Sequence, residues 1–363
     1  MESGFGATAP YTVGVEEEFQ LVDPVSRGLV PAVDEVLAAG EGSRLITSEL
    51  SQSCVEMVSP VFGTVADLAR KLPGLRTEVR DLARSRGVEI VGAGTHPFSE
   101  PTEQPLTGGD HNRRVEEEMG WVARTQAIYG LHVHVAVPDG DTAIVAVNAL
   151  ARHVPLLVAL SANSPFWRGS DTGLASTRVK IVEMFPRSGL PPIFRDWEDF
   201  ENLIETLIAS GSIPDYSWCW WDARPHQRFG TVELRAPDVQ MDAAYTAALA
   251  ALVQCLVTSA DSDGPPTNPL YNAENKWRAV RHGMDADFYD FAAGMAVPAR
   301  SMVRGLIEEL RPVAQDLGCE HELGGVLEIV ELGTGAELQR AALERSGSLE
   351  GVMDYLTQGT AQG

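Results

Sequence analysis

Four short segments alternate apolar residues with acidic or imidazole residues, and this pattern constrains the fold more than any other feature of the chain. Successive side chains of a β-strand point to opposite faces, so each segment predicts a strand with one apolar and one polar face. Together the polar faces offer four glutamates, two histidines and an arginine. The segments are residues 13–21 (VGVEEEFQL), 55–57 (VEM), 131–135 (LHVHV) and 231–236 (TVELRA).

The polar faces predict a metal site if the four strands share one sheet. Crowded carboxylates repel one another strongly at low effective dielectric unless cations lie among them. Oxygen ligands with one or two imidazoles suit Mg²⁺ or Mn²⁺. Glu16 and Glu18 are two residues apart, about 6–7 Å along a strand, which suits two neighbouring ions. Glu17 falls on the apolar side, and the pattern offers no explanation for it.

A simpler interpretation exists for each strand alone. Half-buried antiparallel strands commonly point polar residues at water. That interpretation weakens when the four segments are considered together, because solvent-facing surfaces are usually rich in Thr, Ser, Lys and mixed charge.

Composition restricts the partners. The 363 residues include 28 Lys and Arg against 51 Asp and Glu, a net charge of −23. Such a surface argues against nucleic-acid binding and against docking on anionic membranes. The four cysteines lack CxxC spacing, so we expect a reducing, cytoplasmic location. Residues 143–162 are strongly apolar but contain Arg152, His153 and Pro155, which predicts a buried helix rather than a membrane span.

The order of elements predicts an α+β fold. Helices are expected at residues 33–39, from Thr64 onward, at 143–160, at 197–210 and at 243–259. No glycine-rich phosphate loop follows a strand, so neither a Rossmann nor a P-loop fold is indicated. No linker or repeat divides the chain, and we expect one catalytic domain over 1–363, with a helical part from about 286 to 363.

The same residues carry a family resemblance. Residues 13–23 (VGVEEEFQLVD), 130–135 (GLHVHV) and 231–238 (TVELRAPD) resemble the strand motifs of the glutamine synthetase superfamily. More closely, the chain resembles the YbdK-like carboxylate–amine ligases, also labelled glutamate–cysteine ligase type 2. Further agreement, in the same order, covers 48–60, 94–98 (GTHPF), 160–167 (LSANSPFW), 171–178 (DTGLASTR), 221–225 (WDARP) and 275–283 (NKWRAVRHG).

The resemblance implies a curved, mostly antiparallel sheet with helices on its convex side and divalent ions on its concave face. It implies ATP and Mg²⁺ (or Mn²⁺) as cofactors, and small-molecule carboxylic acid and amine substrates, the acid being glutamate or similar. The γ-phosphoryl group would pass to the acid, and an amine would attack the acyl phosphate. Such a reaction needs charge neutralisation and positioning more than covalent catalysis. A homodimer is also implied.

The resemblance assigns roles residue by residue. The metal ligands are Glu16, Glu18, Glu49, Glu56, His132 and Glu233. Glu49 lies seven residues before Glu56, so the chain must bend at residues 51–53 for both carboxylates to reach one site.

Three arginines and a second histidine complete the expected site. Arg235 matches the arginine that stabilises the transferred phosphoryl group. Arg178 follows a Gly- and Ser-rich loop and could clamp a phosphate or a substrate carboxylate bidentately. His134 and Arg224, together with Arg235, are expected to contact ATP, although Arg224 could equally pack against aromatic rings.

Two other functions stay open at this point. A guanidino-type phosphotransferase on the same fold would stop at a phosphorylated product and need no amine. A non-catalytic binding module could also keep the fold, although it would have no evident reason to keep crowded carboxylates.

Overall fold

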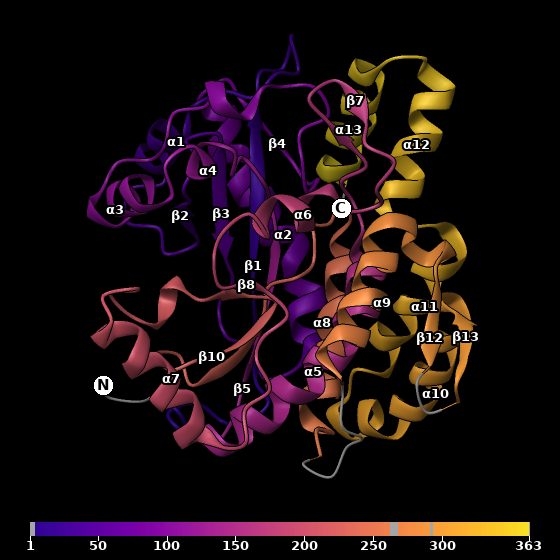
Figure 1. The fold of residues 1–363 in the computed structure, drawn as a ribbon. Coiled ribbons are helices and arrows are strands. Elements are labelled where there is room, and N and C mark those ends of the chain that lie inside the picture. Colours follow the sequence, from indigo (N-terminus) through magenta and orange to yellow (C-terminus); the bar gives the residue numbers. More distant parts are fainter. Residues whose placement is uncertain (1–3, 262–267, 291–292, 363) are drawn as a thin grey trace.

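Figure 1 shows the fold in a computed structural model, which describes residues 4–261, 268–290 and 293–362. A seven-stranded sheet has the order β10-β11-β5-β1-β3-β2, and β4 also pairs with β1. Its pairings are antiparallel, as predicted. The strands are β1 (Val13–Val22), β2 (Ile46–Ser48), β3 (Cys54–Val58), β4 (Glu89–Val91), β5 (Leu131–Ala136), β10 (Ala223–His226) and β11 (Thr231–Leu234).

Four adjacent strands of this sheet, β11, β5, β1 and β3, are the four segments with a polar face. Their apolar faces form the core: Val13, Val15, Val133 and Val232 are at most 1% exposed. The alternation in the sequence therefore predicted both the strands and the side that faces the core.

Three long helices pack on the apolar face of the sheet: α2 (Val65–Ser85), α5 (Gly140–Ser161) and α8 (Ala243–Thr258). α2 begins as predicted at Thr64, whose hydroxyl accepts a hydrogen bond from the Asp67 amide at 3.1 Å. Pro73 lies within α2 and does not split it. The expected helix boundaries at 143–160 and 243–259 differ from α5 and α8 by three residues at most.

α5 alone among the helices of the described residues is long and apolar enough to cross a membrane. However, 78% of its most apolar stretch is buried inside the protein. It contacts α8, α9 (Pro269–His282) and the β10–β11 hairpin. α5 is a core helix, as predicted.

The C-terminal part of the chain is mainly helical, as Figure 1 shows in orange and yellow. α8 contacts the sheet strands β1 and β5, and it also contacts α10 and α11. The elements after α9 are β12 (Asp287–Asp290), β13 (Met295–Pro298), α10 (Ala299–Leu317), α11 (Glu320–Leu332), α12 (Gly335–Ser346) and α13 (Leu349–Gln362).

Short elements complete the fold. The helices are α1 (Val33–Ala39), α3 (Asp110–Met119), α4 (Trp121–Arg124), α6 (Thr177–Val182) and α7 (Trp197–Ala209), with 3-10 turns at Pro101–Glu103, Tyr216–Trp218 and Gly283–Asp285. The short strands are β6 (Phe166–Trp167), β7 (Ser170–Asp171), β8 (Ser188–Gly189) and β9 (Trp220–Trp221). Among these elements, α3, α6 and β9 contribute residues that line the site.

A buried ion pair explains Glu17, which points into the apolar core. Arg76 of α2 donates its Nε to Glu17 Oε2 at 2.9 Å and its Nη2 to Glu17 Oε1 at 2.5 Å. Thr246 of α8 donates its hydroxyl to the same carboxylate at 2.6 Å. Glu17 and Arg76 are 0% and 2% exposed. This network joins β1 to the two helices behind it, a long-range contact that no local pattern reveals.

Candidate metal centre and active site

Strand register brings the predicted metal ligands together in one row across four strands. On β1, Glu18 lies opposite Glu56 of β3, and Glu16 lies opposite His132 of β5. On the far side of β5, His134 lies opposite Glu233 of β11. Directly opposite residues of antiparallel strands share a face, with Cβ atoms about 4.5–5.5 Å apart. The row is therefore continuous from Glu56 to Glu233.

The two histidines lie between carboxylates. His132 Nδ1 is 3.1 Å from Glu16 Oε2, and His132 Nε2 is 3.5 Å from Glu18 Oε1. His134 Nε2 is 3.4 Å from Glu16 Oε1 and 4.0 Å from Glu233 Oε1. Each imidazole thus faces two acidic side chains.

Glu49 joins the row through a bend in the chain. β2 ends at Ser48 and β3 begins at Cys54, and the two strands pair antiparallel, so the chain reverses at residues 49–53. Oxygen atoms of Glu18, Glu49 and Glu56 then lie within 4.8 Å of one another. The bend required by the sequence argument is present.

The crowded carboxylates shift one another's proton affinity. Burial, followed by the charge of Glu18, raises the pKa of Glu49 to about 8. Burial and the charge of Glu49 raise the pKa of Glu56 well above its usual value. Burial also acts to raise the pKa of Glu16, but His134 and His132 overcome it and lower that pKa. Without cations, the row therefore holds protons on some of its carboxyl groups.

The donor set fits divalent metal ions. Three groups of side chains each bring three ligand atoms within 4.8 Å of one another. Nε2 of His132 and of His134 are buried and have no hydrogen-bond partner among the described residues. Carboxylate oxygens with imidazole nitrogens suit Mg²⁺ or Mn²⁺. The groups are Glu16, Glu56 and His132; Glu16, His134 and Glu233; and Glu18, Glu49 and Glu56.

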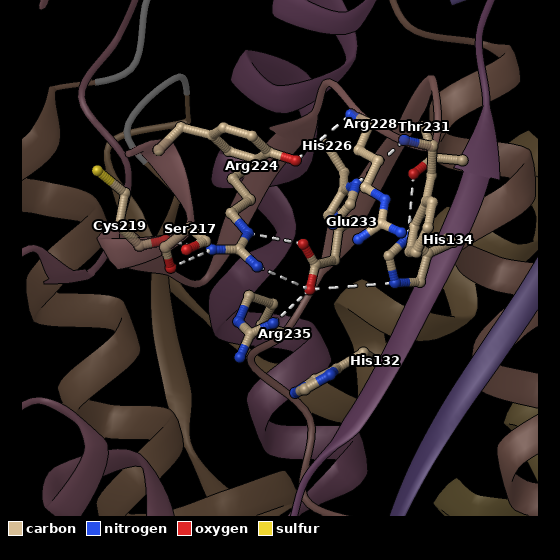
Figure 2. Close-up of polar contacts among 12 residues, drawn as sticks. His132, His134, Ser217, Cys219, Arg224, His226, Arg228, Thr231, Glu233 and Arg235 are labelled. Atoms are coloured by element: carbon tan, nitrogen blue, oxygen red, sulfur yellow. Dashed lines mark hydrogen bonds and ion pairs between the residues drawn. The ribbon is translucent and has the colours of Figure 1, made fainter. Parts of the chain in front are cut away.

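Two arginines flank Glu233 (Figure 2). Arg224 donates its Nε to Glu233 Oε2 at 2.6 Å and its Nη2 to Glu233 Oε1 at 3.4 Å. Arg235 also donates to Glu233 Oε1. Burial acts to raise the pKa of Glu233, but the two guanidinium groups overcome it and hold that pKa well below its usual value. Glu233 is therefore ionised and fixed in orientation.

Arg224 uses four of its five N–H donors on protein acceptors among the described residues. Besides Glu233, its Nη1 donates to the backbone oxygens of Ser217 at 3.0 Å and Cys219 at 2.8 Å. The contact between Arg224 and ATP that the sequence suggested stays a prediction. What the structure displays is a side chain that orients Glu233.

Two cavities lie on either side of the row. The first cavity, of about 220 Å³, is lined by Glu18, Glu49, Arg178 and Arg235, and on its other walls by Phe185 and Trp220. The second cavity, of about 400 Å³, is lined by Glu16, Gly14 and His134 together with Val61 and Phe229. Glu16 and Glu18 are two residues apart on one strand, so β1 runs from one cavity to the other.

Some wall residues of both cavities were not found in the sequence as site residues. Asn112 and Gln126 line the first cavity, and Phe229 lines the second, where its ring stacks on His226 at 4.2 Å. They lie on separate helices and turns, so no local pattern joins them to the strands. The expected residue Arg178 does line the first cavity, on helix α6.

Sequence comparison identifies the family. The glutamate–cysteine ligase family 2 (GCS2) matches residues 12–358. The chain belongs to this family. A Rubrobacter xylanophilus protein named "Putative glutamate--cysteine ligase 2-3" is 58% identical over 99% of this chain and 100% of its own length. A Gloeobacter violaceus protein named "Putative glutamate--cysteine ligase 2" is 40% identical over 98% of each chain.

Solved structures show the same fold. A glutamate–cysteine ligase from Francisella tularensis in complex with AMP has a TM-score of 0.73 at 15% identity, over 99% of this chain and 90% of that one. A bifunctional glutathione synthetase from Pasteurella multocida has a TM-score of 0.72 at 14% identity, over 97% of this chain and 52% of that one. The predicted α+β fold of glutamine synthetase type is confirmed. As a member of the GCS2 family, the chain is a carboxylate–amine ligase of glutamate–cysteine ligase type.

Proposed function

We propose that this glutamate–cysteine ligase family 2 protein joins a small carboxylic acid to an amine at the expense of ATP, with divalent metal ions bound by the row of acidic and histidine residues. The observation that carries the proposal is the register of four adjacent strands. It sets Glu18 opposite Glu56, Glu16 opposite His132, and Glu233 opposite His134.

The metal ligands are proposed as Glu16, Glu18, Glu49, Glu56, His132 and Glu233, with His134 beside them. Bound Mg²⁺ or Mn²⁺ would neutralise the charge of the phosphates during transfer. The buried Nε2 atoms of the two histidines, which lack partners among the described residues, support this assignment.

Arg235 is proposed to stabilise the transferred phosphoryl group. Its side chain is 21% exposed, lines the first cavity and is anchored on Glu233. In the proposed reaction the γ-phosphoryl group passes from ATP to a carboxylate oxygen of the acid, giving an acyl phosphate and ADP. The amine attacks the acyl carbon and loses a proton, and phosphate leaves. A planar guanidinium matches phosphoryl oxygens bidentately.

The two cavities suit two different substrates of this reaction, the nucleotide and the acid. The second cavity has apolar walls and an aromatic ring at Phe229, which suits a flat nucleoside base. The first cavity is polar and lies below the roughly 300–1,000 Å³ of cavities that hold drug-sized ligands, so it suits a small acid. We place the nucleotide near Glu16 and His134, and the acid near Glu18 and Arg235.

Glutamate or a similar acid is the proposed substrate, because the relatives are named for glutamate–cysteine ligation. We also propose that residues 1–363 act as one catalytic domain, because α8 contacts both the strands of the row and the C-terminal helices. The homodimer and the cytoplasmic location stay predictions from the sequence.

The test is phosphate release from ATP with Mg²⁺ over a panel of acids, each with and without a panel of amines, with products identified by mass spectrometry. A product lighter than an acid–amine pair by one water, formed only when both are present, supports the ligase. Phosphate transfer to one substrate with no amine would support a phosphotransferase and contradict the proposal.

A further inference from the structure

Arg178 is a buried cation with no ion-pair partner among the described acidic residues. It is 4% exposed and lines the first cavity. Its Nη1 donates to the backbone oxygen of Ala236 at 3.1 Å, and Nη1 and Nη2 share the backbone oxygen of Arg235 at 3.4 and 3.3 Å. Its Nε is buried and has no partner among those residues. One donor of this guanidinium is thus left without an acceptor among the described residues.

A buried guanidinium that lines a cavity and has an unpaired donor suits a carboxylate. Arginine binds a carboxylate through two parallel N–H···O bonds, which add orientation as well as energy. The carboxylate that reacts must reach the metal ligands and Arg235. An acid that also pairs with Arg178 must therefore carry a second carboxylate, away from the reacting one.

Asp238 holds the segment that carries Arg178. Its Oδ2 accepts from the Asn163 amide at 2.8 Å and from the Ser164 hydroxyl at 2.7 Å, and its Oδ1 accepts from the Ser176 hydroxyl at 3.0 Å. Asp238 is 1% exposed. Burial raises the pKa of Asp238, and Arg178 and these three donors act in the opposite direction.

Ser164 completes the link from Asp238 to Arg178. Its hydroxyl oxygen accepts from the Arg178 amide at 3.1 Å while its proton goes to Asp238. Ser176 directly precedes α6, in which Arg178 is the second residue. Asp238 therefore holds the backbone of Arg178 through Ser164. It also holds the residue before α6 through Ser176.

Two glycines make room for this cluster. A Cβ at Gly130 would lie 2.0 Å from Arg178 Nη2, so the guanidinium lies against bare backbone there. A Cβ at Gly94 would lie 2.6 Å from Asp238 Cγ. Motifs that are far apart in the sequence thus meet at one aspartate.

We propose that Asp238 is a positioning residue, which acts through Ser164 and Ser176 to aim Arg178 at the second, non-reacting carboxylate of the acid substrate. The inference rests on the proposed function for the identity of the reaction, but not for the binding of the acid. It names a residue that touches neither metal ligands nor substrate.

The test measures binding and turnover in parallel. L-Glutamate binding is followed by calorimetry with Mg²⁺ and a non-hydrolysable ATP analogue, and KM values for acid and ATP are measured by phosphate release. Ser164→Ala should weaken L-glutamate binding about five- to tenfold, which corresponds to the loss of about one hydrogen bond's contribution. The KM for ATP should stay within about twofold, because the variant affects only the acid-binding arginine.

A double-mutant cycle separates positioning from general structure. In an Arg178→Ala background, Ser164→Ala should change L-glutamate binding by less than about twofold, because the group that it positions is gone. Asp238→Asn should behave in the same way as Ser164→Ala. Ser161→Ala is the matched control, because Ser161 is also buried but bonds only to the Leu157 backbone oxygen of its own helix. It should leave acid binding unchanged.

Specific results would overturn the inference. If Ser164→Ala weakened the binding of acid and nucleotide equally, Ser164 would have a general structural role. The same would follow if Ser164→Ala had its full effect in the Arg178→Ala background. A wild-type chain that binds none of L-glutamate, L-aspartate and longer dicarboxylates would remove the second-carboxylate assignment. Tight L-glutamate binding without amide formation would contradict the proposed function and leave the role of Asp238 to be decided by the binding cycle.

Discussion

His132 of β5 lies between Glu16 and Glu18 of the neighbouring strand β1. Its Nδ1 is 3.1 Å from Glu16 Oε2. Its Nε2 is buried, 3.5 Å from Glu18 Oε1, and has no hydrogen-bond partner among the described residues. This arrangement places an imidazole nitrogen beside a carboxylate oxygen, so that the two could bind one metal ion when the nitrogen carries no proton. The first prediction follows from it.

Glu16→Gln should abolish metal-dependent turnover while the fold persists. Loss of one charged ligand should lower kcat by roughly 10²–10³-fold or more, by analogy with the removal of other groups that stabilise transition-state charge. The metal-free chain should stay folded but unfold at a somewhat lower temperature, since His132 and His134 lose the carboxylate charge that they face. Thermal stabilisation by Mn²⁺ should be lost.

Glu100→Gln, at a surface ion pair with Arg168, is the control. Unchanged turnover in Glu16→Gln would remove Glu16 from the site.

Arg235→Lys should lower kcat by about 10²-fold or more. Lysine keeps the charge but loses the planar fork that bonds Glu233 and that we propose to bind the transferred phosphoryl group. Arg340→Lys, at the surface pair with Asp171, should leave kcat unchanged. Steady-state kinetics decide between these outcomes, and near wild-type turnover in Arg235→Lys would contradict the assigned role.

Metal binding should release protons. Glu49 has a pKa of about 8 because of burial and the charge of Glu18, so it carries a proton at pH 7 in the metal-free chain. In that chain its contribution to stability is present below the unfolded pKa of about 4.5 and is lost as the pH rises through about 8. Metal ions compete with this proton, so affinity should rise from pH 6 to 8.5.

Calorimetry of Mn²⁺ binding in buffers of different ionisation enthalpy counts the protons released. Glu49→Gln should release fewer protons at pH 7 than the wild type. Equal proton release in the two chains would show that Glu49 is not protonated before the metal binds.

Arg76→Met should lower the free energy of unfolding by about 3–5 kcal/mol, because it leaves the buried Glu17 carboxylate without its ion-pair partner. The double variant Glu17→Gln, Arg76→Met should recover part of this loss, since the uncompensated charge is gone. Urea unfolding measures both values. Additive losses in the double variant would show that the two residues do not act as a pair.

His96 should make stability depend on pH. Its Nε2 donates to the Arg27 backbone oxygen at 2.8 Å, and its Nδ1 accepts from the amides of Phe98 and Ser99. Burial lowers the pKa of His96 from about 6.5 to about 4, against the opposing effect of the Arg27 hydrogen bond. The neutral ring therefore contributes stability that is fully present above about pH 6.5 and is lost as the pH falls towards 4, about 3 kcal/mol in all.

The difference in unfolding free energy between wild type and His96→Gln separates the contribution of His96 from those of other groups that titrate in the same pH range. It should shrink steadily as the pH falls from 7.5 to 5. A difference that stays constant over this range would contradict the buried neutral ring.

Much of the site could be predicted because the two faces of a strand appear in the sequence as an alternation of polar and apolar residues. Glu16, Glu18, His132, His134 and Glu233 alternate with buried residues that are apolar except for Glu17, and the period of two assigns them to one face. Glu49 was harder, because its place depends on a chain reversal at residues 49–53 rather than on a period. The family resemblance placed it on the site, and the paired strands β2 and β3 show how it reaches Glu18 and Glu56.

Other features depend on contacts between residues far apart in the chain. The contacts of Arg224 with Glu233 and two backbone oxygens could not be read from the sequence, and its expected contact with ATP stays a prediction. Glu17 had no explanation until α2 placed Arg76 against it. Asp238 lies at the end of a recognised motif, but its partners Ser164 and Ser176 come from a loop more than sixty residues earlier.

The sequence by itself determined the four strands that carry the polar row, which face of each is polar, and the class of metal that such ligands favour, because alternation and ligand type are local properties. Only the tertiary structure decided the strand order and register that bring Glu18 to Glu56 and His134 to Glu233, and the placement of Arg178 beside the first cavity. Those positions depend on the packing of helices and loops over long sequence separations, where the free energy of burial, rather than any local preference, selects the partner.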